Sequence, residues 1–556
     1  MADQIQMKIK RTNFQHNNNH TSFFSFLLHI QDNQDMKEQL PKLLSHLKSK
    51  TTTSSQSSPL PPCYNLYNAT TSLLRHIVQP ASQSQIQQCI HDGYEAQQKW
   101  HHDYTPTQKA QILLQASQIL SDDPKRQHQL IQLEVNDTGR PIKEIKSYDV
   151  PTAIDALAYY AHMPSILPSG STMNHLDSHH SFSYTIREPL GLTCGIGAWN
   201  YPLVNAVLKS APALIFGNAM VYKPSEMTPS SALMLAEIYE EAGLPRGVFQ
   251  VLLGEGKDVG NMLVEEYCSY NHEHCKEGKI SFTGSVDTGR HIANMTTSSS
   301  SSLTQFHRLN LELGGKSPLI IMDDYNDTID HAVQIAMNAN WYSNGQVCSN
   351  GTRVFVHESI YDEFVSKLIQ KTSQLKIGNP NCDDVDIGPM VSKDHMDRVL
   401  NYVKIGIEED QATLIYGGER LYNDDETDND NTLPKDGFFL SPAIFTNCTD
   451  DMRIVQEEVF GMLMTIMTFQ DETEVLQRAN NTHFGLAAGV LTKDIKRAHR
   501  MASRLKAGTV WINNYNTSYL AMPWGAVKQS GIGRENGIAA LEAWTTEKVV
   551  FVDMEE

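Results

Sequence analysis

The sequence predicts an α/β protein built on parallel sheets, because strand-like and helical segments alternate along it. Short apolar runs rich in β-branched residues lie at 251–253, 279–282 and 319–322, and helical stretches lie at 259–267 and 330–340. This alternation is typical of parallel strands linked by crossover helices. The length of 556 residues exceeds what one hydrophobic core organises, so we expect two domains of roughly 200 residues plus smaller pieces.

Three biased segments interrupt this pattern. Residues 1–60 are rich in Asn, Gln, Ser, Thr and His, and such a composition predicts a flexible extension, because it buries too little apolar surface to order the chain. The polar runs at 296–302 and 424–431 are expected to be surface loops. The segment 181–186 alternates polar with mostly apolar residues, as an ordinary edge strand would.

Charge and cysteine usage restrict the class of partner. The net charge of -19 would repel nucleic acid and anionic membranes, and no run approaches the roughly 20 apolar residues that span a bilayer. The eight cysteines form no C-x-x-C pair, so neither a disulfide framework nor a metal site is indicated. Free thiols favour a cytoplasmic protein, while Lys8, Lys10 and Arg11 ahead of the apolar run 23–30 leave mitochondrial import as an alternative.

Three polar segments carry the candidate chemistry. Cys348 lies in the small, glycine-flanked segment 344–351, Glu312 in the segment 311–318, and Asn200 in the segment 197–202. A thiol and a carboxylate, each beside glycines, are the groups needed to attack a carbonyl carbon and later to activate water. A side-chain amide steadies the oxyanion that such an attack creates. Together the three segments indicate covalent chemistry on an aldehyde, whereas Cys194 and Cys448 are expected to be inert core residues.

From about residue 64 to the C-terminus, the sequence resembles the NAD(P)-dependent aldehyde dehydrogenase superfamily. Besides the three segments above, the stretches 282–285, 457–461 and 530–535 occur in the order in which that family places them. The segments 195–202 and 345–353 are most similar to betaine aldehyde and 4-trimethylaminobutyraldehyde dehydrogenases.

The resemblance implies an aldehyde dehydrogenase-like fold with three parts. These are a Rossmann-type NAD-binding domain formed by 61–166 and 190–311, an α/β catalytic domain formed by 312–523, and a small β oligomerisation element formed by 167–189 and 540–556. In the family this hairpin and the C-terminal strand, here near 548–552, pair across a dimer. The resemblance therefore implies a homodimer or homotetramer.

The resemblance also implies a reaction sequence. The Cys348 thiolate attacks the aldehyde, and the side-chain amide of Asn200 and the backbone N–H of Cys348 hold the oxyanion of the resulting thiohemiacetal. Loss of hydride to the nicotinamide leaves a thioester, for whose hydrolysis Glu312 is the candidate base. We expect a polar, positive or helix-terminal setting to ionise Cys348. Glu535 matches a family position associated with proton relay, and Lys209 matches one associated with oxyanion support. A lone Glu or Lys is more often a solvated surface residue.

The cofactor implied is NAD. A Rossmann G-x-G-x-x-G is absent, and the glycines at 254, 256 and 260 are more typical of a turn. The family variant at 282–289 joins a strand to a helix N-terminus, where Ser285 can face a pyrophosphate or simply cap the helix. Glu226 would repel a 2'-phosphate and so favours NAD over NADP. The matched cofactor residues are Trp199, Lys223, Ser225, Glu226, Gly284, Ser285, Gly289, Leu313, Gly314, Glu458 and Phe460.

An aromatic box is the predicted substrate site. Tyr201, Tyr342 and Trp524 match or adjoin positions whose rings attract a quaternary ammonium group in betaine and aminoaldehyde dehydrogenases. Leu208 stands where many of those enzymes carry a tryptophan. Broad aliphatic or semialdehyde specificity is one alternative, and a non-catalytic, crystallin-like structural protein is another.

Two further departures from the family pattern concern the backbone around the site. Glu312 stands 36 positions before Cys348, two more than is usual, and the extra residues fall near 324–329. Met462 replaces the usual proline after Phe460 and Gly461. An insertion in a loop is tolerated at small entropic cost, so neither departure removes a candidate side chain.

Overall fold

The computed structural model describes residues 64–554, except 69, 72–73, 167–169, 175–179, 274–276, 298–305 and 423–432. All of these belong to one compact unit, Cys63–Glu556. The predicted extension 1–60 and the predicted loop 424–431 lie outside the described residues. Of the predicted loop 296–302, only Thr296 and Thr297 are described, and they end a helix.

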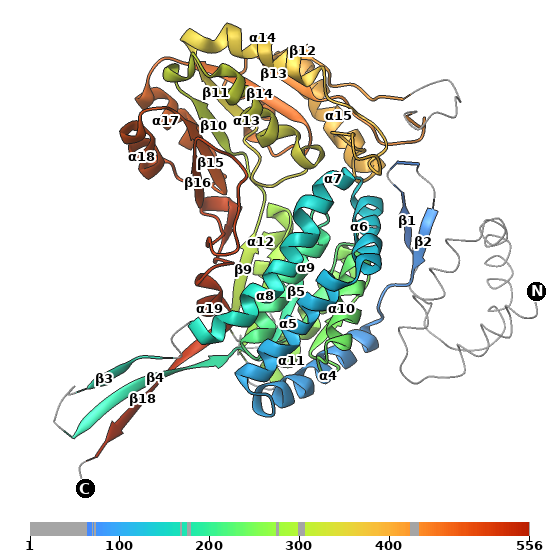
Figure 1. Cartoon of the computed structure of the whole chain (residues 1–556), viewed down its shortest axis with the longest axis vertical. Coiled ribbons are helices and arrows are strands. Elements are labelled where there is room, and N and C mark those ends of the chain that lie inside the picture. Colours follow the sequence, from blue (N-terminus) through green and yellow to red (C-terminus); the bar gives the residue numbers. More distant parts are fainter. Residues whose placement is uncertain are drawn as a thin grey trace, which may run out of the picture. The chain divides into compact units, whose positions relative to one another are not determined.

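The first of the two large sheets has six strands (Figure 1). Its order is β17-β9-β8-β5-β6-β7, and every neighbouring pair is parallel except β17 with β9. Parallel strands need crossover connections, which explains the helix after most strands. The strands are β5 (Leu192–Ile196), β6 (Ala219–Lys223), β7 (Phe249–Val251), β8 (Gly278–Thr283), β9 (His307–Glu312) and β17 (Gly531–Ile532).

Helices cover this sheet and enclose one apolar core. Their starts are encoded locally: Ser82 and Thr105 each form a capping box with the glutamine three residues on, and Asp123 caps the next helix. Gly139 ends that helix in the left-handed conformation. The helices are α4 (Gln83–His102), α5 (Pro106–Asp122), α6 (Pro124–Thr138), α8 (Val150–Ile166), α9 (Pro202–Ile215), α10 (Ser230–Glu241), α11 (Asn261–Glu273) and α12 (Val286–Thr297).

The second large sheet has seven strands, in the order β12-β13-β14-β11-β10-β15-β16, and it has its own hydrophobic core. Its central strands are buried on both faces, as expected for parallel strands between helices. The elements are β10 (Pro318–Ile321), α13 (Ile329–Trp341), β11 (Arg353–His357), α14 (Tyr361–Thr372), α15 (Lys393–Glu408), β12 (Thr413–Tyr416), β13 (Ala443–Thr446), β14 (Leu463–Phe469), α17 (Glu472–Asn480), β15 (Ala487–Leu491), α18 (Ile495–Arg504) and β16 (Thr509–Ile512).

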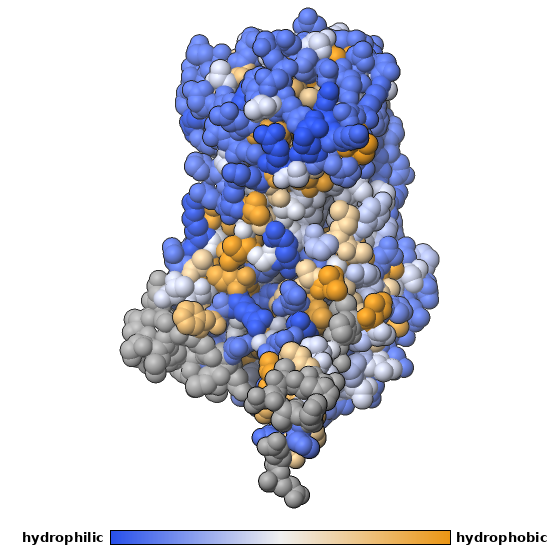
Figure 2. All heavy atoms as spheres, turned by 90° about the vertical axis from the view of Figure 1, so that its left-hand side faces the viewer, coloured by the Kyte–Doolittle hydropathy of each residue, from blue (hydrophilic) through white to orange (hydrophobic). Residues whose placement is uncertain are grey.

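A three-stranded sheet extends from the six-stranded one, in the order β18-β4-β3. Strand β18 (Thr545–Asp553) pairs antiparallel with β4 (Ser181–Pro189) along its whole length, and β3 (Thr172–Asn174) lies on the other side of β4. Two large apolar residues of β18 are exposed, Val549 at 61% and Phe551 at 56%. Figure 2 shows hydrophilic residues over the upper part of one face and more frequent apolar residues below it.

The predicted α/β class with parallel sheets is confirmed. The expected strand at 251–253 is shifted: β7 ends at Val251, because the chain turns at Gly254, whose φ is 153°. The expected helix at 259–267 begins with a π-turn, Gly256–Gly260, ahead of α11. In the described part of the chain, no helix combines the length and apolarity needed to cross a membrane.

Candidate active site

The loop before Cys348 has an unusual backbone. Ser343, Asn344 and Gly345 have φ of 54°, 55° and 72°, so three successive residues are left-handed. A Cβ on Gly345 would lie 2.5 Å from the backbone of the Gly461–Met462 segment, which leaves room only for glycine. The carbonyl oxygen of Cys348 would lie 2.4 Å from a Cβ on Gly315. The loop therefore packs closely against both glycine-containing segments.

Cys348 keeps partial solvent exposure, while Cys194 and Cys448 are buried as predicted. The expected setting that favours a thiolate is not what the structure shows. Burial of the thiol, together with the charges of Glu458 and Glu312, raises the pKa of Cys348 to about 12, although backbone N–H groups oppose the rise. Burial and the two carboxylates together outweigh those donors, so the resting thiol is protonated at neutral pH and requires a base.

Asn200 lies between β5 and α9, and Pro202 opens that helix. The Asn200 side chain is buried, and its Nδ2 donates to the carbonyl of Gln346 at 3.0 Å. Gln346 is two residues before Cys348, so the structure places the predicted amide donor against the loop 343–351, which carries Cys348 and is called the nucleophile loop below. An amide nitrogen carries two hydrogens, so one N–H of Asn200 remains for a second acceptor.

Glu312 ends β9, and its side chain is buried. Among the described residues, neither of its carboxyl oxygens has a hydrogen-bond partner. Burial, reinforced by the nearby Glu535, raises the pKa of Glu312 well above its ordinary value. Because Glu312 also acts on the pKa of Cys348, the predicted nucleophile and base are within electrostatic reach of each other.

Lys209 and Glu535 form a buried pair beside Glu312, rather than solvated surface. Lys209 Nζ lies 3.0 Å from Glu535 Oε1, which also accepts hydrogen bonds from Ser281 at 2.8 Å and Asn310 at 2.9 Å. Burial alone would raise the pKa of Glu535, but Lys209 and these donors hold it below its ordinary value. The ionised form of Glu535 is therefore favoured, whereas the protonated form of the neighbouring Glu312 is favoured.

The segment 282–289 joins β8 to α12. Ser285 Oγ accepts a hydrogen bond from the backbone N–H of Thr288 at 3.2 Å, so the expected helix cap is present. The N–H of Gly284 donates to the Glu312 carbonyl at 3.0 Å, which ties this turn to the segment of the predicted base. A Cβ on Gly289 would lie 2.6 Å from the Leu313 side chain, so the helix can approach that segment only without one.

The segment 223–226 follows β6. Lys223 is buried and donates from Nζ to the Pro224 carbonyl at 2.7 Å, and the same nitrogen lies 3.7 Å from the Glu226 carboxylate. Ser225 Oγ accepts from the N–H of Met227 at 3.3 Å. The Glu226 carboxylate is partly exposed, so its oxygens remain accessible.

Glu458 lies against the double glycine of the segment 311–318. Its Oε1 accepts from the N–H of Gly315 at 2.9 Å, and a Cβ on Gly314 would lie only 1.9 Å from Oε2. Phe460, two residues on, has a φ of 62°, and its ring centroid lies 5.1 Å from that of Trp199 in an edge-to-face arrangement. The structure thus brings together Trp199, Gly314, Glu458 and Phe460 from segments far apart in sequence.

The three predicted aromatic substrate residues lie on three different segments. Tyr201 Oη is 2.7 Å from Ser343 Oγ, next to Tyr342 in the chain. Trp524 is paired through its backbone with Glu535, with both N–H to carbonyl distances at 2.7 Å, and its ring centroid lies 6.3 Å from that of Trp511. Tyr201 and Tyr342 therefore adjoin the nucleophile loop, and Trp524 adjoins the Lys209–Glu535 pair.

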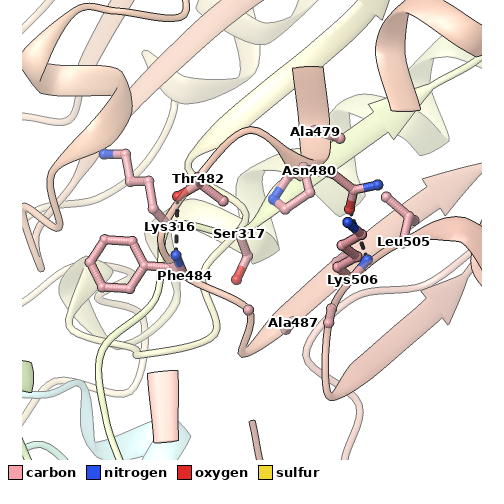
Figure 3. Close-up of a pocket in the computed structure, with 13 residues that line it drawn as sticks. Lys316, Ser317, Ala479, Asn480, Thr482, Phe484, Ala487, Leu505 and Lys506 are labelled. Atoms are coloured by element: carbon pink, nitrogen blue, oxygen red, sulfur yellow. Dashed lines mark hydrogen bonds between the residues drawn. The ribbon is translucent and has the colours of Figure 1, made fainter. Parts of the chain in front are cut away.

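A small pocket is lined by residues 316–318 and by residues from the segments 479–488 and 505–507, in the region of the seven-stranded sheet (Figure 3). Figure 3 shows Lys316 and Phe484 at one side and Asn480 and Lys506 at the other. None of the predicted catalytic side chains lines it. Throughout the described residues, no group of three or more His, Cys, Asp or Glu side chains could hold a metal ion.

Comparison with known proteins places this geometry in a family. The family model described as "Aldehyde dehydrogenase family" matches residues 59–550. This chain belongs to the aldehyde dehydrogenase family. An NAD+ complex of an aldehyde dehydrogenase from Bacillus cereus is 35% identical, with a TM-score of 0.80, covering 89% of this chain and 94% of that one. A betaine aldehyde dehydrogenase from Staphylococcus aureus with NAD+ is 33% identical, with a TM-score of 0.81, covering 90% and 94% respectively.

The structure of this aldehyde dehydrogenase also reveals site residues that the sequence did not indicate. His395 donates from Nε2 to the Phe460 carbonyl at 2.8 Å, and Arg398 donates to the Glu458 carbonyl at 2.8 Å. Both are on α15, three residues apart, so one helix face holds the backbone of this segment. Burial lowers the pKa of His395 to about 4, which keeps the ring neutral. A lone histidine in a polar helix gives no pattern by which to find it.

Proposed function

We propose that this aldehyde dehydrogenase oxidises an aldehyde to a carboxylic acid with NAD, through a thiohemiacetal and a thioester on Cys348. One observation carries the proposal. A partly exposed thiol stands on a loop that accepts a hydrogen bond from Asn200, within electrostatic reach of a buried Glu312 carboxyl that has no other partner among the described residues. A purely structural protein needs none of these three groups.

The chain's own residues fit NAD. The lack of a side chain at Gly289 and Gly314 lets Leu313 and Glu458 approach the backbone closely, and a helix N-terminus such as that of α12 favours a pyrophosphate. We assign the pyrophosphate to Gly284 and Ser285, the adenosine ribose to Lys223 and Glu226, and the nicotinamide ribose to Glu458. Both solved relatives named above carry NAD+, which supports this choice. NAD, when bound, supplies the hydride acceptor.

In the first chemical steps, the residues move one proton and hold one negative charge. Glu312, once deprotonated, takes the proton of Cys348 Sγ, and the sulfur bonds to the aldehyde carbon. The carbonyl oxygen becomes an oxyanion, which the second N–H of Asn200 and the backbone N–H of Cys348 stabilise. Oxidation of this thiohemiacetal removes hydride from the same carbon and leaves a thioester.

In the last steps, Glu312 takes a proton from water, and the water oxygen bonds to the thioester carbon. The carbon–sulfur bond then breaks, the acid leaves, and Cys348 is regenerated. Glu535 beside Glu312 provides a carboxylate acceptor toward which this proton can pass, because Lys209 holds it ionised. The sum is one aldehyde, one NAD+ and one water converted to one acid, one NADH and protons.

For the substrate, we propose betaine aldehyde or a related trimethylamino or amino aldehyde. Near the nucleophile loop, the Tyr342 ring and the face of Tyr201 that Arg140 does not cover favour a cation. One solved relative is a betaine aldehyde dehydrogenase. Leu208 in place of the family's tryptophan favours the alternative, an aliphatic aldehyde or a semialdehyde. Pocket residues rather than the fold decide between these substrate classes.

We also propose a homodimer or homotetramer in the cytoplasm, assembled through the β18-β4-β3 sheet. Val549 and Phe551 expose apolar area on a strand that lies at the edge of its sheet among the described residues, and such an edge is suited to a second copy of the chain. We assign the six-stranded sheet to cofactor binding and the seven-stranded sheet to catalysis. Sedimentation of the purified chain as a monomer would refute the assembly.

The function is tested by following NADH absorbance with betaine aldehyde, 4-trimethylaminobutyraldehyde, hexanal and succinic semialdehyde. We predict that wild type and Cys89→Ala oxidise the cationic aldehydes with the highest kcat/KM, and that Cys348→Ala oxidises none. Cys89 is the matched control because it is also partly exposed. Oxidation by Cys348→Ala at the wild-type rate, or no NADH formation by folded wild type, contradicts the proposal.

A further inference from the structure

A buried arginine links the helical layer of the six-stranded sheet to the nucleophile loop. Arg140 lies between α6 and the short helix α7 (Ile142–Glu144), and it is fully buried. Its Nη1 and Nη2 donate to the two carboxyl oxygens of Asp149 at 2.7 and 2.9 Å. This parallel pair of charge-assisted bonds fixes the plane of the guanidinium. The remaining donors are thereby aimed in set directions.

Those donors contact Ser343 on the nucleophile loop and the backbone of Asn200. Nε donates to Ser343 Oγ at 3.0 Å, and Nη1 also donates to the backbone carbonyl of Asn200 at 3.3 Å. The guanidinium carbon lies 4.0 Å from the ring centroid of Tyr201. One side chain therefore contacts the Asn200 backbone, the nucleophile loop and a predicted substrate residue at the same time.

Ser343 is the acceptor at the centre of this cluster. Its backbone N–H and its hydroxyl donate to the two carboxyl oxygens of Glu144, at 3.1 and 3.0 Å. The single hydroxyl hydrogen is thus committed to Glu144, so Arg140 and Tyr201 both donate to its oxygen. All capacity of this buried hydroxyl is used.

These hydrogen bonds stabilise a backbone conformation that is unfavourable by itself. Ser343 and Asn344 are non-glycine residues in the left-handed region, which is unfavourable for residues with a Cβ. The next residue is held similarly: Asn344 donates to the carbonyls of Gly139 and Pro389, at 3.2 and 2.8 Å. A strained loop persists only where its surroundings fix it, and here part of those surroundings, Arg140, Glu144 and Gly139, comes from the helical layer of the six-stranded sheet.

We propose that Arg140, fixed by Asp149 and acting through Ser343 and the Asn200 carbonyl, is a positioning residue that sets Cys348 against its oxyanion donor. The inference rests on the proposed function. It adds that the relative placement of nucleophile and amide is determined by a guanidinium contributed from the helical layer. Lysine offers three donors on a flexible stem and cannot make the same planar contacts, so charge alone does not suffice.

The test uses Ser343→Ala in the full-length enzyme, because this change removes the acceptor of Arg140 Nε while the guanidinium keeps its two bonds to Asp149. Ser117→Ala is the matched control, since Ser117 is also a buried serine, and its hydroxyl donates to the Ile154 carbonyl at 2.9 Å. Two quantities are measured: kcat with the best aldehyde, and the pH profile of Cys348 alkylation by iodoacetamide, followed by mass spectrometry of the Cys348 peptide. The second measurement needs neither aldehyde nor NAD.

We expect Ser343→Ala to lower kcat at least tenfold while the alkylation of Cys348 becomes faster at neutral pH. A released loop exposes the thiol and moves it away from the groups that face it, Glu312, Glu458 and Tyr148, which favours the thiolate. A merely structural loss would not move the two rates in opposite directions. The control is expected to keep both rates within twofold of wild type.

Retention of the wild-type kcat and alkylation profile by Ser343→Ala overturns the inference. Should that variant fail to fold, Ser343→Gly removes the same hydroxyl at lower backbone strain, and Arg140→Lys keeps the charge without the fork; both are expected to repeat the opposed changes, and wild-type behaviour in both overturns the inference. If wild type oxidises no aldehyde, the proposed function fails, but the alkylation profiles still decide whether the loop is positioned in this way.

Discussion

Cys348, Glu312 and Glu535 show how one small region assigns three protonation states. The ionised form of Glu535 is favoured because Lys209 and Ser281 hold it, whereas Glu312 beside it has no hydrogen-bond partner among the described residues and its protonated form is favoured. Cys348 faces Glu312 and Glu458 and is also protonated. In the resting site, Cys348 and Glu312 must therefore each lose a proton before they can act.

This arrangement predicts a rate that rises with pH. Both raised pKa values belong to groups whose deprotonated forms react, so the active fraction grows as pH increases through and above neutrality. We expect kcat/KM to increase steadily from about pH 6 to about pH 9, with a slope near one decade per pH unit where one group limits. A profile that is flat or falls across this range, in a protein whose circular dichroism is unchanged, contradicts the assignment.

The sequence indicated these residues better than it indicated their charges. Motif order located Cys348, Glu312 and Asn200, because the chemistry restricts residue type and neighbouring glycines. Burial raises the pKa of Cys348, and so does the charge of Glu458, which is 110 positions away in the chain. Arg140 and His395 were missed for the same reason, since their partners are distant in sequence and no local periodicity marks them.

At the scale of elements, glycine positions determine how closely segments approach. The segment 311–318 runs from β9 to β10 and therefore joins the two sheets, and its Gly314 faces Glu458 from the loop before β14. The turn at 282–285, the N-terminus of α12 and the segment at 457–461 meet around it. Local patterns predicted the strands and helices well, but the boundaries at β7 and α11 moved, because Gly254 forces a turn and the first helical turn is a π-turn.

The close approach at Gly314 gives a direct test. In Gly314→Ala the new Cβ would lie 1.9 Å from Glu458 Oε2, so that carboxylate must move. We predict that the KM for NAD rises at least tenfold, because a displaced carboxylate loses its hydrogen bond and costs roughly 1–3 kcal/mol. Gly256→Ala is the control, since nothing lies within 4 Å of its Cβ position. Equal KM values for NAD in the two variants would refute the role of Glu458.

For the whole molecule, the two sheets each have a core, and the candidate site is assembled from segments of both. Alternation of strands and helices was sufficient to predict this class, since parallel sheets require crossovers. The site itself needs the sheets to meet, and that meeting depends on contacts such as Arg140 to Ser343, 203 positions apart in sequence. Such contacts are invisible to any pattern within one element.

The central claim is that Cys348 carries the acyl group and that Glu312 releases it. The most direct measurement mixes Glu312→Gln with NAD and aldehyde in large molar excess over subunits, records NADH in a stopped-flow instrument, and determines the mass of the Cys348 peptide. We predict a burst of NADH close to one per subunit that forms more slowly than the first turnover of wild type, because Cys348 must then lose its proton to solvent. Little further turnover and an acyl adduct on Cys348 are expected, because the thioester forms but water is not activated. Continued turnover without any adduct on Cys348 would contradict the account.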